Sequence, residues 1–124
     1  MNLLQELMEI ILYVEDMNGQ VTFYRDKLGL PVNYPAGLED YADQMWVALD
    51  AGNCVLALHG GGEGRLGADA PKIVFRVEDV NAARKELVGR GVELGNVRDD
   101  VPGKLICDGV DPEGNKFALE SEVS

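Results

Sequence analysis

The stretch IILYVEDMNGQVTFYRDKLGLPV, residues 10–32, decides the fold class of this chain. Its apolar, β-branched start predicts a strand over 8–14, and the acidic pair Glu15-Asp16 marks the beginning of a helix. Apolar residues spaced three and four apart carry that helix over 17–28, where Gly29 ends it. The first half is therefore predicted to be one βαβββ unit, with further strands over 31–36, 45–50 and 54–59.

The second half repeats this order. The run VEDMN at Val14 recurs as VEDVN at Val77, 63 residues later, and Gly52-Asn53 recurs as Gly114-Asn115. The repeat predicts a strand over 72–77, a helix over 79–90, and strands over 92–96, 105–109 and 116–121. We therefore expect one α+β domain over residues 1–124, made of two tandem βαβββ modules, about 8–59 and 72–121, joined by a glycine-rich linker, 60–71.

Composition limits the partners. The chain has 22 acidic against 11 basic residues and a formal net charge of −11, which repels polyanions, so nucleic acid is not an expected partner. No apolar run approaches the roughly 20 residues that span a bilayer, and the first residues lack the pattern of an export signal. We expect a cytoplasmic protein that does not act at a membrane.

Strand alternation divides the candidate residues between two faces of each sheet. In the first strand Ile10, Leu12 and Val14 share one face, and Glu9, Ile11 and Tyr13 share the other. In the corresponding strand of the second module, Lys72, Val74 and Arg76 form the mixed set. The wholly apolar faces are expected to pack on the helices, which leaves the mixed faces to line the space that a curved sheet encloses.

The residues also carry a resemblance. The stretch 10–32, its echo IVFRVEDVNAARKELVGRGVEL over 73–94, and the closing DPEGNKFALES over 111–121 resemble the vicinal oxygen chelate superfamily of glyoxalases, extradiol dioxygenases and bleomycin-resistance proteins. The resemblance implies a cupped mixed sheet that holds a small molecule, in a homodimer. The motifs that carry the resemblance are specific for the superfamily but indicate almost nothing about the reaction.

Metal binding is the property of that superfamily that this sequence matches least. The resemblance implies divalent-metal ligands on the first and fourth strands of each module, at Glu9, Leu56, Lys72 and Ala118. Of these side chains only that of Glu9 offers a ligand atom, whereas a divalent ion needs several oxygen or nitrogen ligands. We therefore expect no cofactor. A metal site made of Glu9, His59 and Glu120 is kept as a minority reading.

The remaining candidates for ligand binding lie on the mixed faces: Glu9, Tyr13, Trp46, Lys72, Arg76 and Glu120. Charges in an enclosed space are costly unless they are paired, so a structural interpretation pairs Glu9 with Lys72 and Arg76 with Glu120. In the functional interpretation, Lys72 and Arg76 hold a polar or anionic group of a ligand. Its apolar part contacts Tyr13, Trp46 and Ile11.

Three function classes follow from these residues. The first is a metal-independent protein that binds a small molecule, as the drug-sequestering members of the superfamily do. The second is a glyoxalase-like lyase or isomerase that uses atypical metal ligands or metal-free acid–base chemistry. The third is a scaffold whose cavity has collapsed. The identity of the ligand does not follow from the sequence.

Overall fold

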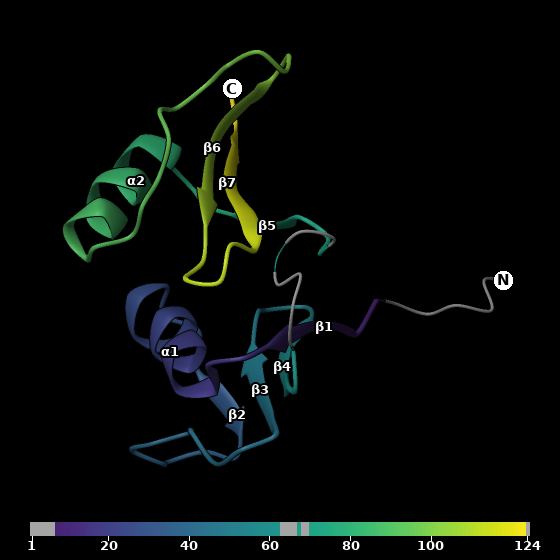
Figure 1. Ribbon diagram of the computed structural model, residues 1–124. Helices are drawn as coiled ribbons and strands as arrows, with labels where there is room; N and C mark the ends of the chain where they lie inside the picture. The colour runs from purple at the N-terminus through teal and green to yellow at the C-terminus, as the bar shows by residue number, and fades with distance from the viewer. Residues whose placement is uncertain (1–6, 63–66, 68–69, 124) are drawn as a thin grey trace, which may run out of the picture. The chain divides into compact units, whose positions relative to one another are not determined.

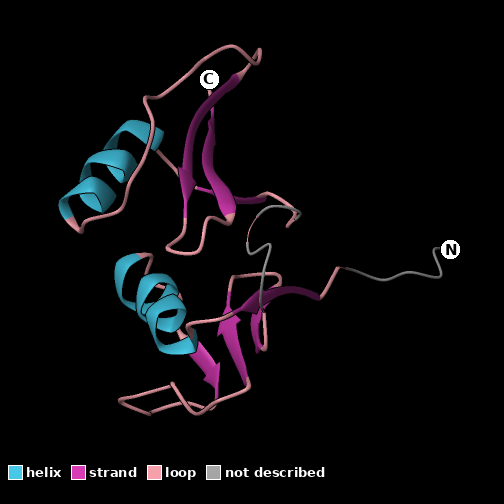
Figure 2. Cartoon of the chain, in the orientation of Figure 1, coloured by secondary structure: helices cyan, strands magenta, loops and turns pink. Residues whose placement is uncertain are grey.

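The computed structural model describes residues 7–62, 67 and 70–123, and the chain divides into two compact units, Met1–Gly64 and Arg65–Ser124. Each unit contains one of the two predicted modules and has a mixed α+β structure (Figures 1 and 2). Of the predicted linker, 60–71, residues 63–66 and 68–69 lie outside the described part. No helix in the described ranges is long and apolar enough to cross a membrane.

The first unit is a four-stranded sheet with the order β1-β4-β3-β2. Its strands are β1 (Glu9–Val14), β2 (Val32–Tyr34), β3 (Trp46–Asp50) and β4 (Val55–Gly60). Strand β1 runs parallel to β4, and β4 pairs with β3 in antiparallel register. This arrangement is the βαβββ unit that the sequence predicts.

The predicted helix over 17–28 forms as two segments. The α-helix α1 (Met17–Val21) begins at Asp16, whose carboxylate accepts a hydrogen bond from the Gly19 N–H at 3.0 Å. A side chain at position 19 would clash with this cap, because an added Cβ would lie 2.3 Å from Asp16 Oδ2. The chain then continues as a π-helical segment, η1 (Thr22–Lys27), which ends before Gly29, where φ is +83°.

The second unit is a three-stranded sheet with the order β5-β7-β6, covered by the helix α2 (Val80–Gly89). Its strands are β5 (Ile73–Arg76), β6 (Lys104–Val110) and β7 (Lys116–Glu122). The strand predicted over 92–96 does not form as a ladder. Only isolated bridges join Leu94 to Gly109 and Arg98 to Ile106. Between these bridges lie three residues on one side, 95–97, and two on the other, 107–108, so the register shifts and the ladder breaks.

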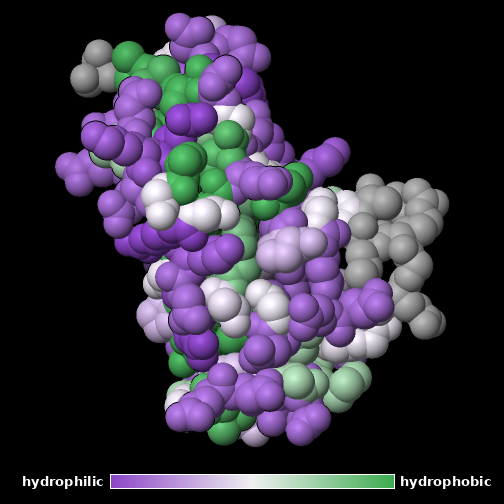
Figure 3. Space-filling model, turned by 60° about the vertical axis from the view of Figure 1, so that its left-hand side comes forward, coloured by the Kyte–Doolittle hydropathy of each residue, from purple (hydrophilic) through white to green (hydrophobic). Residues whose placement is uncertain are grey.

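Burial confirms the predicted division of faces. In β1 the side chains of Leu12 and Val14 are buried while Ile11 and Tyr13 are exposed, and in β5 Ile73 is buried while Val74 is 51% exposed. In each unit the helix contacts its own sheet, α1 on β4 and α2 on β6 and β7 (Figure 1). The face shown in Figure 3 is largely hydrophilic, with hydrophobic residues in smaller patches, in keeping with the acidic composition.

Candidate functional site

Three aromatic rings meet on the helix-free face of the first sheet. Strand pairing sets Tyr13 of β1 and Trp46 of β3 opposite His59 of β4, which lies between them. The ring centroids of Tyr13 and His59 are 5.0 Å apart, and those of Trp46 and His59 are 5.8 Å apart in an edge-on arrangement. Tyr13 is 59% exposed. The three rings, here called the aromatic trio, offer a continuous surface that can stack against a flat organic group.

The imidazole of His59 is fixed within the trio by its own backbone. Its Nδ1 lies 2.6 Å from the carbonyl oxygen of Gly60. Because a carbonyl oxygen can only accept, Nδ1 carries the proton and donates it, which leaves Nε2 of a neutral ring as an acceptor. The sequence interpretation placed His59 only in a minority metal site; the structure shows that the residue joins the predicted pair Tyr13 and Trp46 as a third ring.

Glu9 lies on the same face as Tyr13 but at the other end of β1, paired with Val55. Four residues of strand separate it from the level of Tyr13 and His59, roughly 13 Å at the usual rise per residue. Metal ligands hold an ion at only about 2.0–2.6 Å, so this spacing speaks against one ion shared by Glu9 and His59. The third member of that minority set, Glu120, belongs to the second unit, and the set as a whole stays a prediction.

One implied metal position was assigned to the wrong face. Leu56 pairs with Ile10, faces the helix and is 2% exposed, so it does not occupy the mixed face. The neighbouring Ala57, which pairs with Ile11, lies there instead. In the second unit Ala118 lies on the mixed face as predicted, between Val74 and Asp108.

The side chains at these positions do not fit a divalent ion. Ala57 and Ala118 offer no ligand atom, and Lys72 brings a positive charge that repels a cation. Within the described ranges, no group of three or more His, Cys, Asp or Glu side chains lies close enough to hold a metal.

The mixed face of the second sheet carries a network of ion pairs. Lys72 Nζ donates to Asp108 Oδ1 at 2.5 Å, and Arg98 Nε donates to Asp108 Oδ2 at 2.7 Å. Arg98 also bonds Asp100 at 2.8 Å. The ion pair that the structure gives Lys72 is thus with Asp108 of its own unit. The predicted pairing of Lys72 with Glu9 joins the two units and stays a prediction.

The predicted ion pair between Arg76 and Glu120 is wrong. These two residues are partners in the parallel pairing of β5 with β7, yet the carboxylate of Glu120 accepts a hydrogen bond from Lys104 Nζ at 3.0 Å. Lys104 reaches Glu120 from β6, whose alternation places Lys104 on the same face. No carboxylate among the described residues forms an ion pair with Arg76, and its side chain is exposed.

The two cations around Asp108 lower the pKa of its carboxyl to about 2, with the hydrogen bond from Arg98 as the largest cause and that from Lys72 next. The folded pKa is lower than the unfolded value, so the stabilisation is present above about pH 4 and is lost as the pH falls toward 2. We expect the free energy of unfolding to fall over that window, and to fall less steeply in Asp108→Asn. Urea titrations at stepwise pH check this; equal slopes for the two proteins would contradict it.

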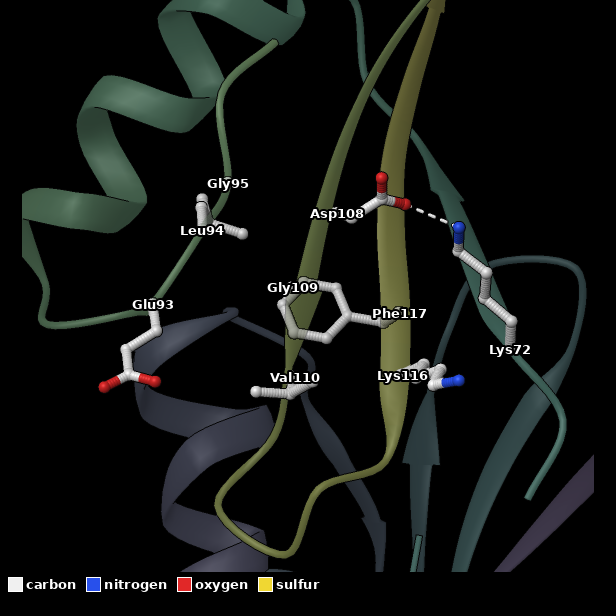
Figure 4. A pocket seen from close by; sticks show the side chains of 9 residues that line it. All are labelled: Lys72, Glu93, Leu94, Gly95, Asp108, Gly109, Val110, Lys116 and Phe117. Carbon is white, nitrogen blue, oxygen red and sulfur yellow. Dashed lines mark hydrogen bonds and ion pairs between the residues drawn. The ribbon is translucent and has the colours of Figure 1, made fainter. Parts of the chain in front are cut away.

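A pocket of about 430 Å³ lies beside this network (Figure 4). Lys72 and Asp108 point toward one another at its edge, while Val110 and Leu94 contribute apolar side chains. The other lining residues are Glu93, Gly95, Gly109, Lys116 and Phe117. The volume falls within the usual range for small-molecule sites.

Of the residues that line this pocket, sequence reasoning identified only Lys72. Strand alternation from Ala118 could have found Lys116, whereas Asp108 lies on β6 and reaches the mixed face through its pairing with Ala118. No such signal exists for Glu93, Leu94 and Gly95, because they belong to the irregular segment that replaces the predicted strand over 92–96.

A family model matches nearly the whole length of the chain. The sequence model of the Glyoxalase/Bleomycin resistance protein/Dioxygenase superfamily matches residues 6–119. No curated protein matches the sequence.

Several solved structures have the same fold over nearly the full length. TnmS3, an antibiotic binding protein from Streptomyces sp. CB03234, matches with a TM-score of 0.80 and 19% identity over 99% of this chain and 100% of that one. A putative glyoxalase family protein from Bacillus anthracis matches with a TM-score of 0.78 and 16% identity over 99% of both chains. Lactoylglutathione lyase from Agrobacterium tumefaciens matches at 0.73 and 18%, over 97% and 96%. At these sequence identities the matches show that the fold is similar, and nothing more.

Proposed function

We propose that this chain, which belongs to the Glyoxalase/Bleomycin resistance protein/Dioxygenase superfamily, binds a small organic molecule without a metal ion. The ligand contacts the helix-free face of a sheet. In the first unit Tyr13 and Trp46 offer contacts for a flat or apolar group, and in the second unit Lys72 and Arg76 offer donors for a polar group. Glu9 and Glu120 lie on the same faces and contribute hydrogen-bond acceptors.

The observation that carries this proposal is the exposed aromatic trio. Burial of an aromatic side chain contributes more free energy to folding than burial of most other side chains. Tyr13 is nevertheless 59% exposed, beside His59 and Trp46, and does not belong to the core of its unit. Aromatic surfaces with a few polar groups nearby are typical of sites that bind small molecules. The antibiotic-binding relative TnmS3 adds support, since its fold is the same.

The rival proposal is an enzyme, and the likeness to a lactoylglutathione lyase is the observation that favours it. Its metal-dependent form is weakened by Ala57, Ala118 and Lys72, which do not fit a divalent ion. A metal-free form would use Glu9, Tyr13 or Glu120 as acid or base. Turnover of a bound ligand, followed by mass spectrometry of the mixture, would favour this rival over simple binding. A scaffold without a site would bind nothing.

Trp46 provides a direct test, because it is the only tryptophan of the sequence. Its fluorescence should change when a ligand covers the aromatic trio. A panel of metabolites and antibiotics, including aromatic carboxylates each matched with its carboxamide, is titrated against the full chain. We expect saturable changes in Trp46 emission with some members. A panel in which no member changes the emission or the heat of mixing would count against the proposal.

Removing the exposed ring of Tyr13 should weaken binding of any ligand found in this way. We expect Tyr13→Ala to raise Kd about tenfold, roughly 1.4 kcal/mol, because stacking area is lost at an exposed ring whose removal leaves no core cavity. Isothermal titration calorimetry measures this change. Val88→Ala, which shortens an exposed side chain on α2, serves as control and should leave Kd unchanged. Equal affinities for wild type and Tyr13→Ala would contradict the assignment of the aromatic trio.

We further propose that the protein acts as a homodimer in the cytoplasm. The support is the kinship with the superfamily. Light scattering on the full chain in solution measures the mass directly, and a mass of one chain at micromolar concentration would contradict the dimer.

A further inference from the structure

We propose that the ligand carries a negative charge, and that Arg76 is the specificity-determining residue that selects it. This inference rests on the proposed function and deepens it, because it names the class of ligand: an organic anion such as a carboxylate.

The mixed face of the second sheet differs in charge from the chain as a whole. Strand alternation and register place four cationic and three anionic side chains on it: Lys72, Arg76, Lys104, Lys116, Asp108, Glu120 and Glu122. The ion pair of Arg98 with Asp100, from the adjoining loop, adds one charge of each sign. This face has a surplus of one positive charge, so an anion meets less repulsion there than the net charge of −11 of the chain would suggest.

Most of these cations are already held by acidic partners. Lys72 and Arg98 share Asp108, at 2.5 and 2.7 Å, and Lys104 holds Glu120 at 3.0 Å. A ligand anion that approached Lys72 or Lys104 would compete with a carboxylate already in place. This competition removes both lysines as the source of charge selection, although Lys72 still lies at the edge of the pocket.

Arg76 differs from Lys72 and Lys104 because the carboxylate opposite it in the strand pairing binds another residue. Glu120 is its neighbour in the pairing of β5 with β7, but the carboxylate of Glu120 is bonded to Lys104. No ion pair or hydrogen bond joins the Arg76 side chain to any described residue. Exposed Val74, two residues earlier on the same face, provides apolar area next to the guanidinium. Arg76 therefore presents free donors beside a surface that can contact the organic part of a ligand.

The chemistry of the guanidinium group suits a carboxylate. Its planar fork donates two parallel hydrogen bonds to the two oxygens of a carboxylate, whereas a carboxamide offers only one oxygen acceptor and no charge. Lys116 is the other cation on this face with no ion pair to a described carboxylate. Lys116 lies at the start of β7. Its ammonium group cannot donate two parallel hydrogen bonds in the planar geometry of a guanidinium, so Lys116 serves as a matched control for Arg76.

The test uses the matched pairs of the ligand panel. We expect wild-type protein to bind aromatic carboxylates at least about tenfold more tightly than their carboxamides, and Arg76→Gln to lose that preference because its affinity falls far more for the carboxylates than for the carboxamides. Lys116→Gln, which removes the same charge from the same face, should keep the preference. Arg76 is exposed and forms no ion pair with a described residue, so Arg76→Gln should unfold at the same urea concentration as wild type.

Three outcomes would overturn the inference: equal affinity of wild type for both members of each pair, an Arg76→Gln variant that keeps the preference, or a loss of preference in Lys116→Gln instead. In each of these cases ligands still bind, so the proposed function stands. If no panel member binds at all, the proposed function fails and this inference fails with it.

Discussion

Replacing Phe117 with alanine is expected to lower the free energy of unfolding by about 3–5 kcal/mol, the cost of removing a fully buried ring. Phe117 is 0% exposed, and its ring lies edge-on to that of Phe75 at a centroid distance of 6.3 Å. It also packs against the backbone at Gly109, where an added Cβ would come within 2.8 Å of Phe117 Cζ. Urea unfolding followed by far-UV circular dichroism measures the change.

The matched control is Val74→Ala, on the neighbouring strand β5 but on the opposite face of the sheet. Because Val74 is 51% exposed, its truncation leaves no cavity and should change the free energy of unfolding by about 0.5 kcal/mol or less. If Phe117→Ala cost no more than Val74→Ala, the assignment of faces in the second unit would be wrong, and with it the placement of Lys72, Arg76 and Glu120.

The second large effect is expected at Asp111, in the turn between β6 and β7. Its carboxylate accepts hydrogen bonds from the backbone N–H groups of Glu113 and Asn115, both at 2.9 Å, and from Asn115 Nδ2 at 2.7 Å. Both Asp111 and Asn115 are buried. Asp111→Ala leaves these donors without their acceptor, and we expect a loss of about 3 kcal/mol, measured by the same urea titration.

Asp108→Asn is the natural comparison, because Asp108 is also an acid with several partners but is partly exposed. Water can replace its partners, so its substitution at neutral pH should cost clearly less than that of Asp111. An Asp111→Ala variant as stable as wild type would show that the turn does not depend on this carboxylate.

The same turn explains why the motif DPEGN predicts fold and not chemistry. The carboxylate of Asp111 closes the turn, and Gly114 adopts φ = +87°, a conformation that side chains rarely take. Gly52 in the first unit adopts φ = +88°, in line with the sequence repeat. These residues determine the backbone conformation of the turn. They therefore identify the superfamily but give no information about the ligand.

Strand and helix positions followed from local pattern because alternation and capping act over a few residues. Asp16 and Asp79 both cap their helices as the sequence indicates. The error at Leu56 also has a local cause. Two residues lie between Gly52 and Val55, the residue of β4 that corresponds to Lys116 of β7, whereas one lies between Gly114 and Lys116. Counting the same number of positions from each glycine therefore assigned opposite faces.

The partners of the charged residues could not be predicted from local pattern. Lys72 pairs with Asp108, 36 residues away, and Arg98 reaches the same carboxylate from the irregular segment before β6. His59 became part of the aromatic trio only through the register of three strands. Such contacts depend on which strands become neighbours, and alternation alone does not fix that.

Metal-independent binding is the central claim, and one measurement tests it most directly. Purified protein is titrated with a panel ligand while Trp46 emission is recorded, before and after dialysis against a chelator, and its metal content is determined by mass spectrometry. We predict less than stoichiometric divalent metal and the same Kd in both titrations. A stoichiometric ion whose removal abolishes binding, and whose return restores it, would contradict the claim.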